Sequence, residues 1–259
     1  ALDRPITVRK SNEQLPLSAA QQQFWLLEKI NPGSPSYSLS YPLEIVGELN
    51  VDIFQQSLTQ IIHRHEILRT TFSTVEGKPA QVVLSDVSFS LPVVDLQDLG
   101  PVEQEKIVER RLLEYGQQGF DLSKGPLLRA CLLRLAPTRS LLLLSVHHIM
   151  FDGWSFSILL SELQKIYEAA LSGIPSGLPD LAIQYADYAI WQKQQSSKLE
   201  SQLAYWENQL SGALPLLNLP GDRLRPSEPS FRGAIQTFKL SRSLHDALER
   251  LSQAEGVTL

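Results

Sequence analysis

The stretch LLLLSVHHIMFDGWS, residues 141–155, decides how the rest of the chain is interpreted. Its apolar run has the length of a β-strand and ends in two adjacent histidines, His147 and His148. An acid and a glycine, Asp152 and Gly153, follow three residues later, and an amphipathic helix begins there. A strand, a polar loop and a helix in this order place titratable groups at the mouth of a sheet, where α/β folds commonly carry their chemistry.

The composition is that of an ordinary globular protein, with 43% apolar and 20% charged residues. Its 259 residues are enough for one large domain or for two lobes, each with its own core. The net charge of −5, without a lysine- or arginine-rich block, argues against nucleic acid as a partner. The single cysteine, Cys131, excludes an internal disulfide and fits a reducing compartment.

The apolar run at 141–144 is far too short to span a bilayer. The start of the chain lacks the basic and apolar regions of a signal peptide. We therefore expect a cytoplasmic protein that meets no membrane.

The spacing of apolar residues predicts alternating helices and strands, and therefore an α/β fold. Helices are expected at 19–30 (with Ser18 as N-cap), after Asn50 or Asp52, at 102–115, after residue 155, at 182–195, at 199–210 and from Leu244. Strands are expected at 37–46, 80–84, 89–94, 127–135, 140–146 and 234–240, and residues 68–72 are β-prone.

Composition also predicts how the chain is divided. Residues 1–14 are polar and aperiodic, which is typical of a linker. Glycine and proline concentrate at 172–179, which predicts a boundary between a first lobe at 15–175 and a second part at 176–259. The proline-rich segment 214–231 is expected to be extended, and the sequence holds no internal repeat.

Several interpretations fit the motif His147-His148-x-x-x-Asp152-Gly153. A histidine titrates near neutrality, so it could act as general base on the amine or hydroxyl of a small substrate. Adjacent strand residues face opposite ways, so only one histidine faces a given cavity. The second interpretation is a metal site of two histidines and an acid, although no His-x-His or His-x-x-x-His spacing supports it.

In the third interpretation, the histidines simply end a strand and Asp152 caps the next helix. A serine hydrolase is the weakest alternative, because the sequence contains no Gly-x-Ser-x-Gly elbow. The residues alone leave the first three interpretations open.

Residues 147–155, HHIMFDGWS, resemble the His-His-x-x-x-Asp-Gly core motif of condensation domains from nonribosomal peptide synthetases. That motif also occurs in related enzymes of the chloramphenicol acetyltransferase superfamily. Three further stretches resemble condensation-domain motifs, in the family's order, at 18–27 (SAAQQQFWLL), 64–72 (RHEILRTTF) and 185–192 (YADYAIWQ). The four motifs together make the resemblance specific, and they cover nearly the whole chain.

The resemblance implies an α/β (α+β sandwich) fold of two chloramphenicol acetyltransferase-like lobes arranged in a V. Each lobe has a mixed, mainly antiparallel sheet flanked by helices. The implied active site is a tunnel at the lobe junction, entered by the 4′-phosphopantetheine arms of donor and acceptor peptidyl carrier proteins. The amine of an acceptor aminoacyl thioester attacks a donor thioester there and forms an amide bond. No cofactor or metal is implied beyond those arms, and an adenylation domain is an implied neighbour.

The resemblance also assigns roles to the motif residues. His148 corresponds to the family's active-site histidine, and His147 is expected to orient it. Asp152 is expected to be structural and ion-paired with an arginine, for which Arg64 is the candidate, with Arg69 behind it.

Four more residues are candidates for the site. Gly153 is expected to let a substrate or a tunnel wall approach the backbone, and its amide is a candidate donor to the developing oxyanion. Trp154, Ser155 and Trp206 are candidates for the tunnel or the lobe junction.

The family's later motifs, which lie in the second lobe, are missing from this sequence. By resemblance, the chain is the N-terminal part of a condensation domain and holds only the start of a second lobe. Most of the second tunnel wall would then come from the remainder of the domain.

Other members of the family remain as alternatives. One alternative is an ester-forming domain that uses a hydroxyl acceptor, and another is a non-catalytic domain that only docks a carrier protein. His147 weighs against the cyclisation type, which usually carries aspartate at that position. The segment 31–37 (NPGSPSY) looks more like domains that accept an L-configured donor.

Overall fold

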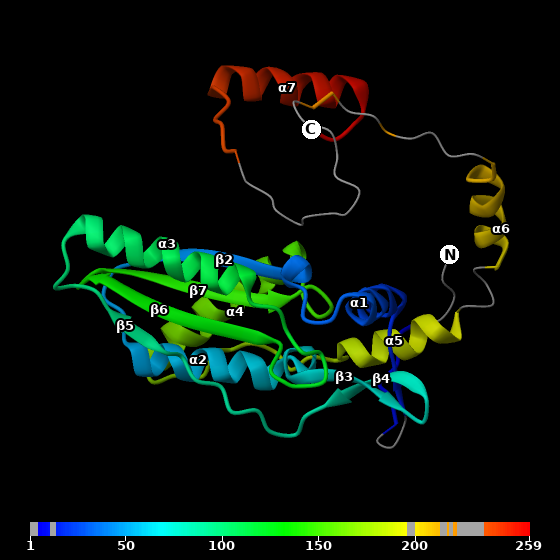
Figure 1. Cartoon of the computed structure of the whole chain (residues 1–259), viewed down its shortest axis with the longest axis horizontal. Coiled ribbons are helices and arrows are strands. Elements are labelled where there is room, and N and C mark those ends of the chain that lie inside the picture. Colours follow the sequence, from blue (N-terminus) through cyan, green and yellow to red (C-terminus); the bar gives the residue numbers. More distant parts are fainter. Residues whose placement is uncertain (1–4, 11–13, 196–199, 213–216, 218–219, 222–235) are drawn as a thin grey trace. The chain divides into compact units, whose positions relative to one another are not determined.

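The computed structural model describes residues 5–10, 14–195, 200–212, 217, 220–221 and 236–259 (Figure 1). The chain forms two compact units, Ala1–Leu214 and Pro215–Leu259. In the second unit, the described secondary structure is one helix, α7 (Arg242–Glu255), which Ser241 caps. All other described helices and strands lie in the first unit.

The centre of the first unit is a four-stranded sheet in the order β2-β7-β6-β5. Its strands are β2 (Ser38–Val46), β7 (Arg139–His147), β6 (Leu128–Ala136) and β5 (Val93–Asp95). β5 runs parallel to β6, whereas β7 is antiparallel to both of its neighbours. The mixed, mainly antiparallel sheet that the resemblance implied is therefore confirmed.

Strand β7 is buried on both faces. Leu142 and Leu144 pack into the large core shared with α2 (Val51–Arg64) and α4 (Gly153–Leu171). Leu143 packs into a smaller core shared with α3 (Pro101–Gln117), which lies on the opposite face of the sheet from α2 (Figure 1). Side chains alternate along a strand, so an unbroken run of leucines is what a strand covered on both faces requires.

A second, antiparallel sheet has the order β1-β4-β3, with β1 (Leu15–Pro16), β4 (Lys78–Val83) and β3 (Thr70–Val75). Helix α1 (Ala19–Ile30) begins at Ser18 with a capping box, in which Ser18 and Gln21 each accept the other's backbone amide. The predicted cap and bounds of this helix are confirmed.

Helix α5 (Tyr185–Gln194) packs beside β1 and the start of α1. The hydroxyls of Tyr185 and Ser18 lie 3.0 Å apart, and the amide of Ala19 donates to Gln192 Oε1 at 2.8 Å. Two 3₁₀ turns and a further helix complete the described elements, namely η1 (Pro35–Tyr37), η2 (Glu66–Arg69) and α6 (Glu200–Gln209). No described helix combines the length and the apolar character needed to cross a membrane.

Three strand predictions were wrong in part. The β-prone segment 68–72 begins as the turn η2, and β3 starts only at Thr70. The segment 89–94 joins the sheet only from Val93, because the amide of Leu91 donates to Gln55 of α2 rather than to a strand. Residues 236–240 form no strand, and residues 234–235 lie outside the described part of the chain.

Two predictions about the organisation of the chain are not tested. Most of the segment 214–231, expected to be extended, lies outside the described residues. The lobe boundary between residues 175 and 176 stays a prediction.

Candidate functional site

The two histidines of the motif lie at the end of β7, where the chain leaves the sheet. The amide of His147 donates to the carbonyl of Leu127 at 3.1 Å, and the amide of His148 donates to the carbonyl of Tyr37 at 2.8 Å. The amide of Met150 then donates back to the carbonyl of His147 at 3.2 Å, which turns the chain. Backbone hydrogen bonds therefore fix both histidines.

His147 is fully buried, with 0% of its surface exposed. Its Nδ1 accepts the backbone amide of Ile149 at 3.0 Å, which places the ring proton on Nε2. Burial, with a smaller contribution from His148, lowers the pKa of His147 to about 4. His147 is therefore a neutral imidazole at pH 7 and cannot readily take up a proton.

His148 has a different environment and is partly exposed. Its ring stacks on Phe24 of α1, with centroids 4.8 Å apart and an interplanar angle of 22°. Within the described part of the chain, its Nδ1 is buried and has no hydrogen-bond partner. Of the two histidines, His148 is the one that a ligand can reach.

Asp152 is exposed and caps the N-terminus of α4. Its Oδ1 accepts the amide of Ser155 at 2.8 Å and the hydroxyl of Ser155 at 2.6 Å. The hydrogen bonds from the Ser155 hydroxyl and amide lower the pKa of Asp152. The carboxylate is therefore ionised at neutral pH and holds the first turn of the helix.

The predicted ion pair between Asp152 and Arg64 is wrong. Nε of Arg64 lies 3.1 Å from Glu162 Oε2, and its Nη2 donates to the carbonyl of Pro179 at 2.7 Å. Glu162 lies ten residues after Asp152 on α4, which is about 15 Å along the helix axis at 1.5 Å per residue. The last turn of α2 therefore meets α4 at Glu162, away from the helix cap.

Arg69, the alternative partner, is also engaged elsewhere. Its Nη2 lies 3.7 Å from Glu66, and its Nη1 donates to the carbonyl of Leu84. Glu66 in turn binds Arg9 at 2.7 Å. Arg64 and Arg69 thus hold α2, η2 and the start of the chain, not the motif loop.

Of the remaining predicted residues, Gly153, Trp154 and Trp206 are exposed, and Ser155 is partly buried. A Cβ added to Gly153 would meet no atom within 4 Å. Trp154 is 81% exposed on the first turn of α4, and Trp206 is 58% exposed on α6. Space for an approaching group therefore exists at Gly153, and the tunnel roles of Trp154, Ser155 and Trp206 stay predictions.

The motif does not gather ligand atoms as a metal site does. Among the described residues, one group of histidine and acidic side chains brings its possible ligand atoms within 4.8 Å of one another. This group consists of His245, Asp246 and Glu249. These residues lie on α7, in the other unit.

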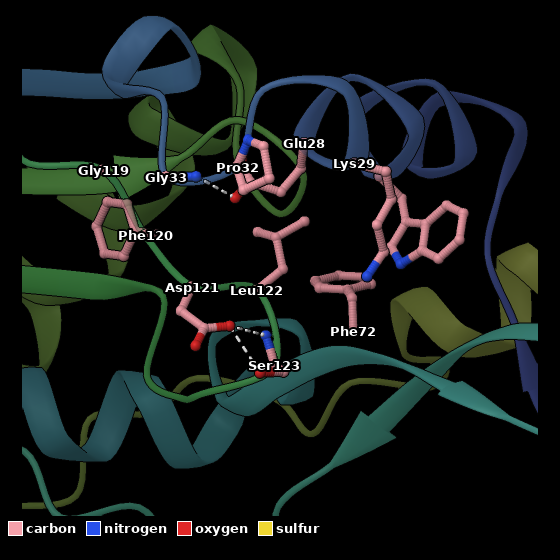
Figure 2. A pocket seen from close by; sticks show the side chains of 11 residues that line it. Glu28, Lys29, Pro32, Gly33, Phe72, Gly119, Phe120, Asp121, Leu122 and Ser123 are labelled. Carbon is pink, nitrogen blue, oxygen red and sulfur yellow. Dashed lines mark hydrogen bonds between the residues drawn. The ribbon is translucent and has the colours of Figure 1, made fainter.

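A cavity of about 470 Å³ opens between the end of α1 and the loop 119–123 (Figure 2). Glu28 and Gly33 lie on one side, and Phe120 and Asp121 lie on the other. Glu28 Oε1 accepts the amide of Gly33 at 2.7 Å, and burial raises the pKa of the Glu28 carboxyl. Phe120 connects this cavity to the motif, because its ring meets that of His147 edge-on with centroids 6.1 Å apart.

The family model of the condensation domain matches residues 11–259 of the chain. The chain belongs to the condensation-domain family of nonribosomal peptide synthetases. One of the proteins of linear gramicidin synthase from Brevibacillus parabrevis is 43% identical to this condensation domain over 247 residues, which is 95% of the chain and 5% of that protein. Phosphinothricin tripeptide synthetase PhsC from Streptomyces viridochromogenes is 39% identical over 246 residues, covering 94% of the chain and 23% of that protein.

Solved structures resemble this condensation domain in fold. The X-domain from teicoplanin biosynthesis superposes with a TM-score of 0.81 at 29% identity, covering 99% of this chain and 56% of that one. The starter condensation domain of rhizomide synthetase RzmA gives a TM-score of 0.70 at 25% identity, covering 78% of this chain and 49% of that one. The chain thus spans about half the length of each of these structures.

Sequence reasoning missed the aromatic neighbours of the histidines in this condensation domain. Phe24 stacks on His148 and meets His147 edge-on, with centroids 6.5 Å apart in the second contact. Phe24 lies within the first family motif, which was a usable signal. Phe120 lies in a loop without periodicity, so no pattern in the sequence indicates its position.

Proposed function

We propose that this condensation domain contributes the catalytic histidine of a peptide-bond-forming acyltransferase, and that this residue is His148. The amine of an acceptor aminoacyl thioester attacks the carbonyl of a donor thioester, so that a C–N bond forms and the C–S bond breaks. The donor's thiolate leaves, and the amine loses one proton. Both substrates arrive on the 4′-phosphopantetheine arms of peptidyl carrier proteins.

The difference between the two histidines is the observation that carries this assignment. His147 is buried and has its Nδ1 occupied by the amide of Ile149. His148 is partly exposed, and its ring is held by Phe24 on one face. A residue that receives or positions an amine must be reachable by substrate, and it must be fixed in orientation. His148 meets both requirements.

The other motif residues support the loop. Asp152 keeps the first turn of α4 in place through Ser155, and the amide of Gly153 is the candidate donor to the oxyanion of the tetrahedral intermediate. Trp154 and Ser155 begin the same helix, and we propose that they line the substrate path together with Trp206. Arg64 and Arg69 act at a distance, by fixing the end of α2.

The reaction belongs to the whole polypeptide that carries this chain. This condensation domain covers about half of the solved structures that it matches. We therefore assign it as partners the remainder of the condensation domain, the donor and acceptor carrier proteins and an adjacent adenylation domain. Neither nucleic acid nor a membrane takes part.

The test uses the intact polypeptide with donor and acceptor loaded on their carriers. His148→Ala is expected to lower the rate of amide formation by about 100-fold or more, the range for loss of a general acid–base group. The matched control is His63→Ala, which removes an exposed histidine from the end of α2. Unchanged product formation in His148→Ala, measured by mass spectrometry of the acceptor arm, would reject the assignment.

A second function is favoured by one comparison. The X-domain from teicoplanin biosynthesis is also solved in complex with OxyB, and that structure covers 99% of this chain with a TM-score of 0.80. The second candidate is therefore a domain that docks a partner protein without chemistry. This docking function predicts that the wild-type protein binds a loaded carrier but forms no product. It also predicts that His148→Ala binds the loaded carrier as tightly as the wild type does.

The ester-forming alternative uses the same histidine. Matched acceptors that carry an amine or a hydroxyl at the same position distinguish the two reactions. Faster turnover of the hydroxyl acceptor would identify an ester-forming domain.

A further inference from the structure

We propose that Arg129 is a positioning residue for the histidine pair, and that it acts through the ring of Phe120. The proposal rests on the proposed function of His148. It assigns a role to a residue on β6, outside the motif.

Arg129 lies in an unusual environment for a cation. In the described part of the chain, its partners are two carbonyls and a ring rather than a carboxylate. Its Nη2 donates to the carbonyls of Gln118 and Gly119, each at 2.8 Å, and its guanidinium lies 3.7 Å from the centroid of Phe120. Its Nε is buried without a hydrogen-bond partner among those residues. Arg129 is partly buried, and desolvation of a guanidinium without a counter-charge costs free energy, so its position needs another explanation.

The loop Gln118–Phe120 is held from two sides. Arg129 binds its carbonyls from the sheet. On the other side, a Cβ on Gly119 would lie 2.0 Å from the carbonyl oxygen of Gly33, so the two backbones are in close contact. Figure 2 shows Gly33 and Gly119 next to each other, with Phe120 following on the same loop. These contacts restrict the backbone that carries Phe120.

Phe120 passes this constraint to His147. Arg129 pairs directly with Ser145 across the sheet, and Ser145 is two residues before His147 on β7. Arg129 and His147 therefore lie on the same face of the sheet. The ring of Phe120 stands edge-on to His147 at an interplanar angle of 88°. Arg129, whose guanidinium lies 3.7 Å from the centroid of Phe120, restricts the movement of this ring.

Phe24 completes the connection to His148. Its ring meets His147 at an interplanar angle of 86° and stacks on His148 at 22°. The order of contacts is therefore Arg129, Phe120, His147, Phe24 and His148. If Arg129 is lost, the loop and Phe120 gain freedom, and so does the ring of His147. A misplacement of about 1 Å at a reacting group can cost about 100-fold in rate, so a looser histidine pair lowers turnover.

The first experiment measures condensation in the intact polypeptide with variants of the two residues. Arg129→Ala is expected to lower kcat by about tenfold or more, while KM for the loaded acceptor carrier stays unchanged. Arg129→Lys keeps the charge but loses the planar fork, and it is expected to lower kcat as well. The matched control is Arg134→Ala on the same strand, where the arginine is paired only loosely with Asp95, at 3.9 Å.

Substitutions of Phe120 separate a ring effect from a charge effect. Phe120→Tyr keeps the ring and is expected to keep the wild-type kcat. Phe120→Leu is expected to reproduce the loss seen in Arg129→Ala. The double variant Arg129→Ala with Phe120→Leu is expected to be no slower than either of these single variants, because the two substitutions remove the same contact. Additive losses, or a wild-type kcat in Phe120→Leu, would overturn the proposal.

The second experiment needs no substrate. Diethyl pyrocarbonate acylates accessible imidazoles, and peptide mass spectrometry assigns the modification to each of the five histidines. Arg129→Ala and Phe120→Leu are expected to speed acylation of His147, while His63 and His245 react as in the wild type. If Arg129→Ala unfolds, acylation of all five histidines will be faster, and the result for Phe120→Leu then decides the question. Unchanged protection of His147 in that variant overturns the proposal, even if the wild type proves inactive.

Discussion

Asp152 caps helix α4 through Ser155, whose amide and hydroxyl both donate to the same carboxylate oxygen at 2.8 and 2.6 Å. The aspartate of the motif is therefore an exposed helix cap. Loss of a cap of this kind costs about 1 kcal/mol, whereas loss of one partner of a buried ion pair costs about 3–5 kcal/mol. The two interpretations of Asp152 thus predict different stabilities.

We predict that Asp152→Ala folds and loses about 1 kcal/mol in the free energy of unfolding, measured by urea denaturation. Asp152→Asn is the matched control, because asparagine offers an acceptor in the same position and keeps most of the cap. The contribution of Asp152 is present above its unfolded pKa and is lost as the pH falls through its lowered folded pKa. A loss above about 3 kcal/mol in Asp152→Ala would point to a buried ion pair after all.

His147 predicts a second pH dependence. Its pKa is about 4 in the folded protein, against 6.5 for an unperturbed histidine. Between these values the unfolded chain binds a proton that the folded chain excludes. The contribution of His147 to the free energy of unfolding is therefore fully present above pH 6.5 and falls as the pH falls towards 4. A shift of this size corresponds to about 3 kcal/mol, at about 1.4 kcal/mol per pKa unit.

His147→Asn tests this dependence, because the amide oxygen of asparagine can still accept the Ile149 amide. We expect this variant to flatten the decline of the free energy of unfolding across that pH window. His63→Gln removes an exposed histidine and controls for the loss of one titratable group. An unchanged slope in His147→Asn would show that His147 does not carry the dependence.

The parts of the fold that were predictable are those with a local signal. The leucine run of β7 and the capping residue Ser18 each specify an element without reference to the rest of the chain. The partner of Asp152 was not predictable, because an acid before a helix fits a cap and an ion pair equally well. The packing of α2 along α4 decides it, by bringing Arg64 to Glu162.

In the candidate site too, only features with a local sequence signal were predictable. Four motifs indicated the family and one of them indicated His148, but the sequence did not indicate that Phe120 would reach His147. Phe120 lies in a loop, and its position depends on Arg129 and on the contact between Gly119 and Gly33. Such contacts join segments far apart in the chain, so no periodicity reports them.

Glu162 carries the third prediction, because two side chains, those of Arg64 and His65, share its Oε2. Arg64 Nε lies 3.1 Å from this oxygen and His65 Nε2 lies 2.6 Å from it, and only 14% of the Glu162 side chain is exposed. Glu162→Ala is expected to lower the free energy of unfolding by about 2 kcal/mol, since both partners lose a charged acceptor. The matched control is Glu114→Ala on α3, where an exposed ion pair with Arg111 is worth less than about 1 kcal/mol. Equal losses in urea denaturation would contradict the prediction.

Gly119 carries the last prediction. A methyl group here would overlap the carbonyl oxygen of Gly33, 2.0 Å away, and neither backbone can yield without moving its loop. Gly119→Ala is therefore expected to destabilise the protein by about 2 kcal/mol or more, the range for overpacking a close contact. It should also speed acylation of His147 by diethyl pyrocarbonate, because Phe120 is displaced with the loop.

Gly116→Ala is the matched control for this substitution. Gly116 lies three residues earlier, inside α3, and a Cβ there meets no atom within 4 Å. Alanine is favoured over glycine in a helix by about 0.5–1 kcal/mol, so this variant should be slightly more stable than the wild type. The same chemical change thus has opposite signs at two neighbouring positions. A Gly119→Ala protein as stable as wild type would mean that the two loops separate at little cost, and Phe120 would then not be held above His147.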